Sequence, residues 1–385
     1  MALNYDIIIY IEESKMIKNK LNSLTKPLLM GPGPSCVSDS VYKALSRPTI
    51  GHLDPRFISL MNDISSFLRK LMQTKNMLTI PVSATGSAGM EACFVNLIEP
   101  NDKVLILSNG VFGGRMEDIA QRLQASVNTI NFEWGAPVNV DAVKEHFVKN
   151  SYDLVAIVHA ETSTGVCNPI SEIGKLVKDN GALYLVDCVT SLGGIELKMD
   201  KWNIDALYSG TQKCISCPPG LSPVSFSNQA LKKISDRKIK VPNWYLDISM
   251  LTQYWSGKER VYHHTAPINM LYGLYQACYD ILDEGLDQVI NRHFEMHKLL
   301  ISELESIGLE LFVEKSCSLP MLNVVRVPKG INDIEIRKKL LEDFSIEIGG
   351  GLGHLSGKIW RIGLMGETAK HQSIQKLMDA LKKIL

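Results

Sequence analysis

The sequence predicts an α/β protein: a large domain with a mostly parallel mixed sheet flanked by helices, then a small C-terminal α/β domain. Apolar runs of strand length recur between residues 78 and 226, and helical patterns lie between several of them. Two of these runs lead into polar residues, Asp187 and Lys213, whose spacing of 26 positions suits two strands joined by one crossover. Strands and helices alternate again after residue 285, which predicts the second domain.

The elements are expected in the following order. Apolar residues three and four apart predict a helix over 57–71. Strands are expected at 78–82, 102–108, 127–132, 154–158, 181–187, 204–208 and 222–226, with helices at 90–98 and 170–180. Residues 227–261 are expected to be irregular, and a helical pattern over 271–304 breaks at Gly285. The small domain is expected to hold strands at 309–313, 324–327, 346–348 and 359–362 and helices at 334–344 and 373–384.

These patterns divide the chain into an N-terminal arm (1–26), a large domain (27–284) and a small C-terminal domain (285–385). Acidic residues at positions 6, 12 and 13 argue against a mitochondrial transit peptide. The C-terminal Lys-Ile-Leu differs from the Ser-Lys-Leu peroxisomal signal. With no clear targeting signal, we expect a cytoplasmic or peroxisomal protein.

Composition narrows the class of protein. The chain has 385 residues, of which 45% are hydrophobic, and its 41 basic and 41 acidic residues give a formal net charge of zero. This balance favours neither nucleic acid nor an acidic membrane surface as a partner. No apolar run has the length of a membrane span. The eight scattered cysteines indicate free thiols in a reducing compartment.

A turn of small residues, SATGSAG at 83–89, follows the strand 78–82 and precedes a helix. Strand, turn and helix in this order point backbone N–H groups at an anion. The hydroxyls of Thr85 and Ser87 could bind a phosphate or simply cap the helix. The residues alone leave both alternatives open.

The segment YSGTQK at 208–213 ends a buried strand and carries Lys213 into an irregular loop before PPG at 218–220. One interpretation is an ordinary surface lysine. The other is an amine in a dry pocket, where desolvation favours the neutral form that reacts with an aldehyde. Asp187 ends the neighbouring strand, and a pyridoxal phosphate enzyme needs such a pair: the lysine carries the aldehyde as an imine, and the carboxylate keeps the pyridine nitrogen protonated.

The runs VDCVTSLGG at 186–194, YSGTQK at 208–213 and PPG at 218–220 resemble the class V aminotransferases of pyridoxal-phosphate fold type I. Within this family the chain is most similar to the alanine–glyoxylate and serine–pyruvate aminotransferases, from about residue 27 to the C-terminus. The resemblance implies pyridoxal 5′-phosphate as cofactor and Lys213 and Asp187 as catalytic residues. It further implies that the cofactor is bound by Thr85, Gly86, Ser87, Phe112, Thr162, Asp187, Val189, Gln212 and Lys213.

In this resemblance Thr85, Gly86 and Ser87 hold the phosphate, and Phe112 and Val189 pack on the two faces of the ring. Some relatives have tryptophan at the position of Phe112, and phenylalanine keeps the stacking face but lacks the indole N–H. Thr162 follows the strand 154–158 in the polar cluster HAETSTG at 159–165, where its hydroxyl reaches the ring oxygen. Glu161 and Thr164 also lie near the site.

The substrate side is expected to hold Arg361, Gly51 and His52. Arg361 stands in the middle of an apolar strand, and a buried arginine needs an anion: a structural carboxylate or the substrate's α-carboxylate. The resemblance favours the substrate. It also implies that GPGP at 31–34 leads into the site and that Gly51 and His52 approach the substrate.

The resemblance implies a homodimer in which Tyr262 and Thr265 of YHHT (262–265) reach the phosphate of the partner's cofactor. The paired histidines within that segment suggest zinc, but adjacent residues rarely bind one ion and no further pair has ligand spacing, so we expect no metal. The run GGGLG at 349–353 does not fit the dinucleotide-binding spacing. Cys214 and Cys217 form a lone Cys-x-x-Cys, which is weak support for redox chemistry.

We therefore predict a pyridoxal-phosphate transaminase that moves the amino group of alanine or serine to glyoxylate or pyruvate by a ping-pong mechanism. Its partners are then a small amino acid and a 2-oxo acid. A related transaminase using kynurenine-type or 2-aminoethylphosphonate donors remains an alternative. So does a pyridoxal-phosphate lyase such as a desulfurase, which needs a cysteine or another acid near the substrate. A catalytically silent binding protein would be expected to lack Lys213 or Asp187, and both are present.

Overall fold

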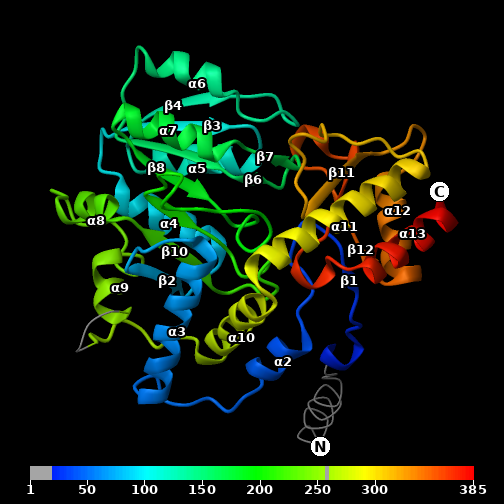
Figure 1. Ribbon diagram of the computed structural model, residues 1–385, viewed down its shortest axis with the longest axis horizontal. Coiled ribbons are helices and arrows are strands. Elements are labelled where there is room, and N and C mark those ends of the chain that lie inside the picture. Colours follow the sequence, from blue (N-terminus) through cyan, green and yellow to red (C-terminus); the bar gives the residue numbers. More distant parts are fainter. Residues whose placement is uncertain (1–19, 256–259) are drawn as a thin grey trace, which may run out of the picture.

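The computed structural model describes residues 20–255 and 260–385 and has two parts (Figure 1). The predicted N-terminal arm, residues 1–26, lies mostly outside the described residues; of it, η1 (Lys20–Ser23) is a short 3-10 helix. The larger part is built on a sheet of seven strands. The α/β class, with a mostly parallel sheet flanked by helices, is as predicted.

The strands of the large sheet are nearly all parallel. Only β10 runs antiparallel, to β2 on one side and β9 on the other. The spatial order is β2 (Leu78–Val82), β10 (Ser222–Phe226), β9 (Ala206–Tyr208), β8 (Leu183–Asp187), β5 (Leu154–Val158), β3 (Lys103–Ser108) and β4 (Ser126–Asn131). Apart from β4 and the first residue of β3, the strands are buried along their whole length, as expected for a sheet covered on both faces.

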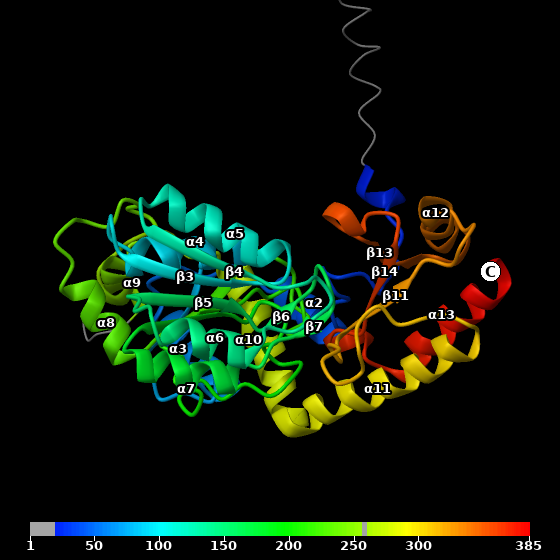
Figure 2. The ribbon, with the colours of Figure 1, turned by 90° about the horizontal axis from the view of Figure 1, so that it is seen from above.

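Helices cover both faces of this sheet, and Figure 2 shows α4 and α5 above it and α6 and α7 below. The helices of the large part are α2 (Asp39–Leu45), α3 (Pro55–Met72), α4 (Gly86–Leu97), α5 (Val111–Arg122), α6 (Val140–Phe147), α7 (Ile170–Asn180), α8 (Asn228–Ser235), α9 (Ile248–Trp255) and α10 (Ile268–Glu284). The α3 helix fits its prediction because Asp54 caps it and seven of its residues are buried. Parallel strands that alternate with helices bring their carboxyl ends to one edge, where a site can form.

The smaller part begins with α11 (Leu286–Ser306), which runs from the large part across the small one (Figure 1). Its sheet is antiparallel, with β14 (Ile359–Gly363) between β11 (Leu322–Arg326) and β13 (Gly349–Gly350). The helices α12 (Asp333–Phe344) and α13 (His371–Ile384) pack against it. A two-residue strand from the start of the chain, β1 (Leu28–Leu29), pairs in parallel with β12 (Ile346–Glu347).

Two expectations about secondary structure are wrong. Residues 309–313 do not form a strand. Among the described residues, this run makes a single isolated β-bridge, between Leu311 and Val325. Residues 227–261, expected to be irregular, contain α8 and α9. The α8 helix has eight residues and buries only Ala230 and Ile234, so its apolar pattern is too short to detect, and its cap at Ser227 is the stronger local signal.

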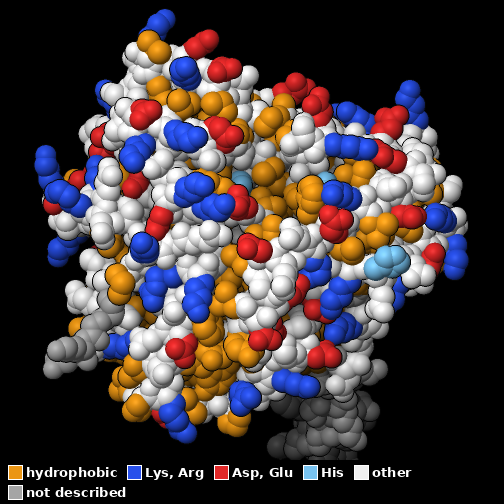
Figure 3. All heavy atoms as spheres, in the orientation of Figure 1, with side chains coloured by type: hydrophobic (Ala, Val, Ile, Leu, Met, Phe, Trp, Pro, Cys, Tyr) orange, Lys and Arg blue, Asp and Glu red, His pale blue; other side chains and the backbone are white. Residues whose placement is uncertain are grey.

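No helix in the described part of the chain is long and apolar enough to cross a membrane. Basic and acidic side chains are interspersed over the face seen in Figure 3. That face therefore presents no large field of one sign, in keeping with the zero net charge of the sequence.

Packing of α7 on the large sheet yields a test of the fold. A β-carbon on Gly174 would lie 2.0 Å from the carbonyl oxygen of Trp202, so backbone would have to move. We expect Gly174→Ala to destabilise the protein by about 1–3 kcal/mol through overpacking, although alanine favours helix. Gly114→Ala in α5 is the matched control, because nothing lies within 4 Å of its β-carbon. Urea unfolding midpoints of both variants measure the difference, and an equal effect at both positions would contradict the packing.

Candidate active site

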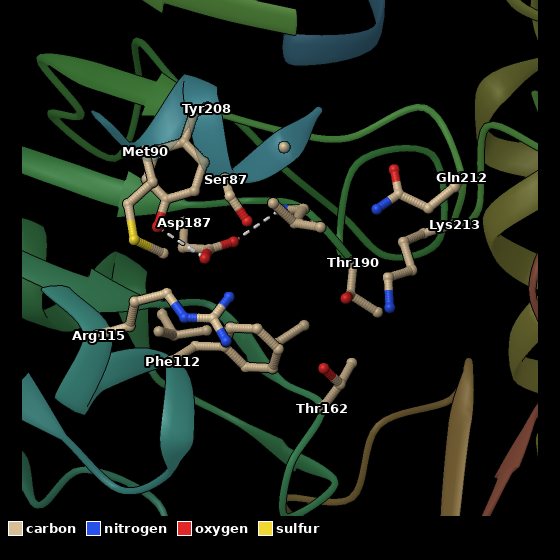
Figure 4. Close-up of a pocket in the computed structure, with 14 residues that line it drawn as sticks. Ser87, Met90, Phe112, Arg115, Thr162, Asp187, Thr190, Tyr208, Gln212 and Lys213 are labelled. Carbon is tan, nitrogen blue, oxygen red and sulfur yellow. Dashed lines mark hydrogen bonds between the residues drawn. The ribbon is translucent and has the colours of Figure 1, made fainter. Parts of the chain in front are cut away.

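A cavity of about 190 Å³ lies at the carboxyl-terminal edge of the large sheet (Figure 4). Strand β8 ends in Asp187 and β9 ends in Tyr208, and both side chains line it. The first turns of α4 and α5 line it as well. Eight residues predicted from the sequence meet here: Gly86, Ser87, Phe112, Thr162, Asp187, Val189, Gln212 and Lys213.

Lys213 is buried, with 9% of its surface exposed. Its Nζ donates to the carbonyl oxygen of Pro32, and a β-carbon on Gly33 would lie 2.6 Å from that nitrogen. Ser35 holds the lysine backbone, because its hydroxyl donates to the carbonyl of Lys213 at 2.7 Å. Burial, with a smaller contribution from the positive charge of Arg361, lowers the pKa of the amine to about 8. A substantial fraction of this amine is therefore neutral near pH 8.

Asp187 faces the cavity from the opposite side to Lys213 (Figure 4). The backbone N–H of Val189 donates to its Oδ1 at 2.8 Å, and the hydroxyl of Tyr208 donates to Oδ2 at 2.7 Å. Burial raises the pKa of this carboxyl to about 6, while those two hydrogen bonds act in the other direction. The carboxylate is thus fixed in direction and ionised above about pH 6.

The first turn of α4 offers hydrogen-bond donors to the cavity. Thr85 is the N-cap residue of α4, but its hydroxyl makes no capping bond. Thr85 and Ser87 are exposed, whereas Gly86 is buried against Val189. The capping alternative for Thr85 is therefore wrong, and its hydroxyl is available at a helix N-terminus, where the helix dipole favours an anion.

Arg361 lies in the middle of β14 and is buried. Its Nε donates to the carbonyl of Gly350 at 2.7 Å and its Nη1 to the carbonyl of Thr162 at 3.0 Å. Among the described residues, Nη2 has no hydrogen-bond partner. Burial lowers the pKa of the guanidinium to about 10. The group stays charged at neutral pH and keeps one edge for an anion.

Six predicted residues are not among those that line this chain's cavity. Thr85 and Arg361 are two of them, and the other four are Gly51, His52, Tyr262 and Thr265. Tyr262 is 60% exposed, and its hydroxyl lies 3.2 Å from that of Thr265, which is also exposed. The ring of His52 packs against the ring of Tyr262 at 5.6 Å between centroids, and Gly51 is exposed beside it. These residues therefore form an exposed cluster of their own.

Comparison with known proteins identifies the family, since the family described as Aminotransferase class-V matches residues 38–365. The chain belongs to the class V aminotransferases. It is 36% identical over 375 residues to the (S)-ureidoglycine–glyoxylate transaminase of Bacillus subtilis, covering 93% of this chain and 90% of that one. It is 38% identical over 366 residues to the alanine–glyoxylate aminotransferase of Rattus norvegicus, covering 94% and 88%.

A solved structure of an alanine–glyoxylate aminotransferase from Nostoc sp. superimposes on this chain with a TM-score of 0.91. The two share 44% sequence identity, and the match covers 96% of this chain and 99% of that one. The fold of this class V aminotransferase is therefore that of pyridoxal-phosphate fold type I, as predicted. Class V aminotransferases depend on pyridoxal phosphate, and their substrates are amino acids and oxo acids.

The cavity of this aminotransferase also contains residues that sequence reasoning missed: Met90, Arg115, Val158, Ala160, Thr190 and Tyr208. Thr190 and Tyr208 lie in the segments 186–194 and 208–213, which resemble the family. Their positions at or just after the ends of strands are the signal that could have identified them. Arg115 could not be found in this way, because α5 was not predicted. Its guanidinium carbon lies 5.1 Å from the centroid of the Phe112 ring.

Histidines and cysteines form no metal site in the described residues, where no group of three or more potential ligands comes together. Nδ1 of His263 lies 2.8 Å from Nδ1 of His264, and Nε2 of His264 lies 2.7 Å from the hydroxyl of Ser83. The two rings thus pair with each other, and His264 also pairs with the loop after β2, whereas Nε2 of His263 is buried without a hydrogen-bond partner among the described residues. Cys214 and Cys217 are free and buried, and burial raises the pKa of each thiol to about 12.

The lowered pKa of Lys213 can be measured without a cofactor. We expect competitive labelling with acetic anhydride to show half-maximal reactivity of Lys213 near pH 8, since only the neutral amine present above the pKa reacts. Peptide mass spectrometry gives the profile. Arg361→Gln serves as the paired variant and should move the midpoint to higher pH, because it removes a neighbouring positive charge. A midpoint near the ordinary lysine value of 10.5 in the native protein would contradict the geometry.

Proposed function

We propose that this class V aminotransferase binds pyridoxal 5′-phosphate and transfers the amino group of a small amino acid, alanine or serine, to glyoxylate or pyruvate. The observation that carries the proposal is the placement of the buried amine of Lys213 and the buried carboxylate of Asp187 on opposite sides of one cavity (Figure 4). Membership of the family supports the reaction class. The two named glyoxylate transaminases support glyoxylate as the acceptor.

The residues of the cavity fit this cofactor. Phe112 and Val189 are apolar walls between which a flat ring can lie. Asp187 suits a protonated ring nitrogen, and the N-terminus of α4 with Thr85 and Ser87 suits a phosphate. Oε1 of Gln212 is buried without a hydrogen-bond partner among the described residues, which is consistent with a polar group of a ligand beside it.

When bound, pyridoxal phosphate supplies an aldehyde that condenses with amines and a protonated ring that accepts electrons. Asp187, ionised above about pH 6, holds the proton on the ring nitrogen. Arg361 binds the carboxylate of the donor and later that of the acceptor through its free edge. Nζ of Lys213 would take the proton from the donor's Cα as general base and deliver it as general acid to the cofactor carbon, and the second half-reaction would reverse this transfer.

The second candidate donor is (S)-ureidoglycine, because the Bacillus subtilis relative is named for it. Kynurenine-type and 2-aminoethylphosphonate donors stay as weaker alternatives, since no feature of the cavity selects them. A lyase of the desulfurase kind needs a cysteine or another acid at the substrate. Among the described residues, no cysteine lines the cavity. Transamination is therefore the function that these side chains support best.

We propose that the enzyme works as a homodimer in which Tyr262 and Thr265 complete the partner's phosphate site. Their exposure on this chain, away from its own cavity, supports this proposal. The cytoplasmic or peroxisomal location and the division at residues 26 and 284 stay predictions, although α10 ends at Glu284 and α11 begins at Leu286.

The visible absorption spectrum tests the function. We expect the purified protein, supplied with pyridoxal phosphate, to show an absorption band in the visible region. This band should decrease on addition of L-alanine and return on addition of glyoxylate. L-Serine and (S)-ureidoglycine are then compared as donors at equal concentration. Lys213→Ala should lose turnover while still binding the cofactor without a covalent link. Normal transamination by Lys213→Ala, or no band in the native protein, would overturn the proposal.

Arg361 provides a test of the substrate side. Arg361→Gln should raise the KM for L-alanine and for glyoxylate by about tenfold or more, because a charged, bidentate hydrogen bond to each carboxylate is lost. Arg326→Gln on the neighbouring strand β11 is the matched control, since Arg326 is exposed. Steady-state kinetics of both half-reactions measure the effect. Equal KM values in the two variants would exclude Arg361 as the carboxylate anchor.

A further inference from the structure

Helix α5, which carries Phe112 to the cavity, has no capping side chain of its own. Its N-cap residue is Gly110. The first N–H groups of a helix have no partner within it and must find one elsewhere. Here they find partners in a segment 50 residues further along the chain: the N–H of Val111 donates to the hydroxyl of Ser163 at 2.9 Å, and the N–H of Phe112 donates to Oε2 of Glu161 at 3.2 Å.

Gly110 is required by this arrangement. A β-carbon at that position would lie 2.3 Å from the carboxyl carbon of Glu161 and 2.5 Å from the hydroxyl of Ser163. The space that an ordinary capping side chain would fill is thus occupied by the carboxylate and the hydroxyl from the other segment. The first two N–H groups of α5 take their acceptors from Ser163 and Glu161 in that space.

Glu161 has none of its surface exposed. Its Oε1 accepts hydrogen bonds from the N–H of Ser163 at 3.0 Å and from the hydroxyl of Ser163 at 2.6 Å. Burial raises the pKa of this carboxyl, and the hydrogen bonds from Ser163 and Phe112 oppose that rise. The positive charge of Arg361 lies close enough that Glu161 raises the pKa of the guanidinium. A buried carboxylate with three donors and a cationic neighbour is well satisfied.

The same short segment also reaches the substrate side. Thr162, which stands between Glu161 and Ser163, lines the cavity, and its carbonyl accepts from Nη1 of Arg361 at 3.0 Å. The position of the Phe112 ring and the position of Arg361 are thus tied to one three-residue segment. A small shift of Glu161 would move one wall of the cavity.

We propose that Glu161 is a positioning residue of this enzyme: it caps α5 from the 159–165 segment and thereby fixes Phe112 against the face of the cofactor ring. The inference rests on the proposed function for the identity of the ring, but not for the cap itself. Glu161 touches neither substrate nor reacting atoms in this role. It acts through the backbone of Phe112.

Amide hydrogen exchange of the cofactor-free protein tests the cap directly. Glu161→Gln keeps the size of the side chain, but its NH₂ group replaces an acceptor, so at least one of the three hydrogen bonds is lost. We expect exchange of the Val111 and Phe112 amides to speed up by about tenfold or more, in peptides that cover residues 108–116. Glu172→Gln is the matched control, since Glu172 is exposed on α7. Ser163→Ala should show a smaller increase centred on Val111.

Circular dichroism of the bound cofactor tests the consequence for the ring. With pyridoxal phosphate added, Glu161→Gln should show a reduced induced signal at the cofactor band and a Kd for the cofactor raised about tenfold, because the stacking wall is less fixed. Unchanged exchange at residues 111 and 112 overturns the cap. Faster exchange with an unchanged cofactor signal overturns the positioning role. A native protein with no cofactor band would instead refute the proposed function and leave the exchange result standing.

Discussion

Burial of Lys213 beside a backbone carbonyl, rather than beside a carboxylate, is the constraint on which the rest of the site depends. Nζ donates to the carbonyl of Pro32, and Gly33 leaves the space that the side chain needs. A carboxylate at that distance would stabilise the ammonium and keep the amine protonated. The carbonyl dipole of Pro32 accepts the hydrogen bond from Nζ but stabilises the charged ammonium much less than a carboxylate would. Desolvation therefore dominates, and a lysine with a pKa of about 8 results.

The segment that holds Lys213 is anchored in the smaller part of the molecule, which couples the two parts. Met30 is buried in the core of the smaller part, and its carbonyl accepts from the N–H of Gly363 at 2.7 Å. Gly363 ends the strand that carries Arg361, and a β-carbon on it would lie 2.1 Å from the carbonyl oxygen of Gly31. Backbone thus packs on backbone here. The separation of the Lys213 amine from the Arg361 guanidinium is set by these few residues.

The sequence predicted those parts of the site that follow from a local pattern of strand, turn and helix. Asp187 is visible because it ends an apolar run, and the turn after β2 is visible because small residues separate a strand from a helix. Arg115 was missed because α5 has two glycines in its first turn and takes its cap from Glu161 and Ser163, so the start of the helix has no local signal, although Met116, Ile119 and Ala120 have helical spacing. The failed strand at 309–313 has the right composition. It pairs with β11 through a single bridge, and the extent of such pairing depends on tertiary contacts that a local sequence pattern does not reveal.

The charges of the site respond to one another, and this has a consequence for catalysis. Arg361 lowers the pKa of Lys213 in the ligand-free protein. If Arg361 binds the substrate carboxylate, as we propose, that carboxylate offsets the positive charge and raises the affinity of Lys213 for a proton. Linkage makes the effect reciprocal: protonation of Lys213 and binding of a carboxylate favour each other. On the proposed mechanism, the amine is therefore a stronger base when a substrate is present to give up its Cα proton.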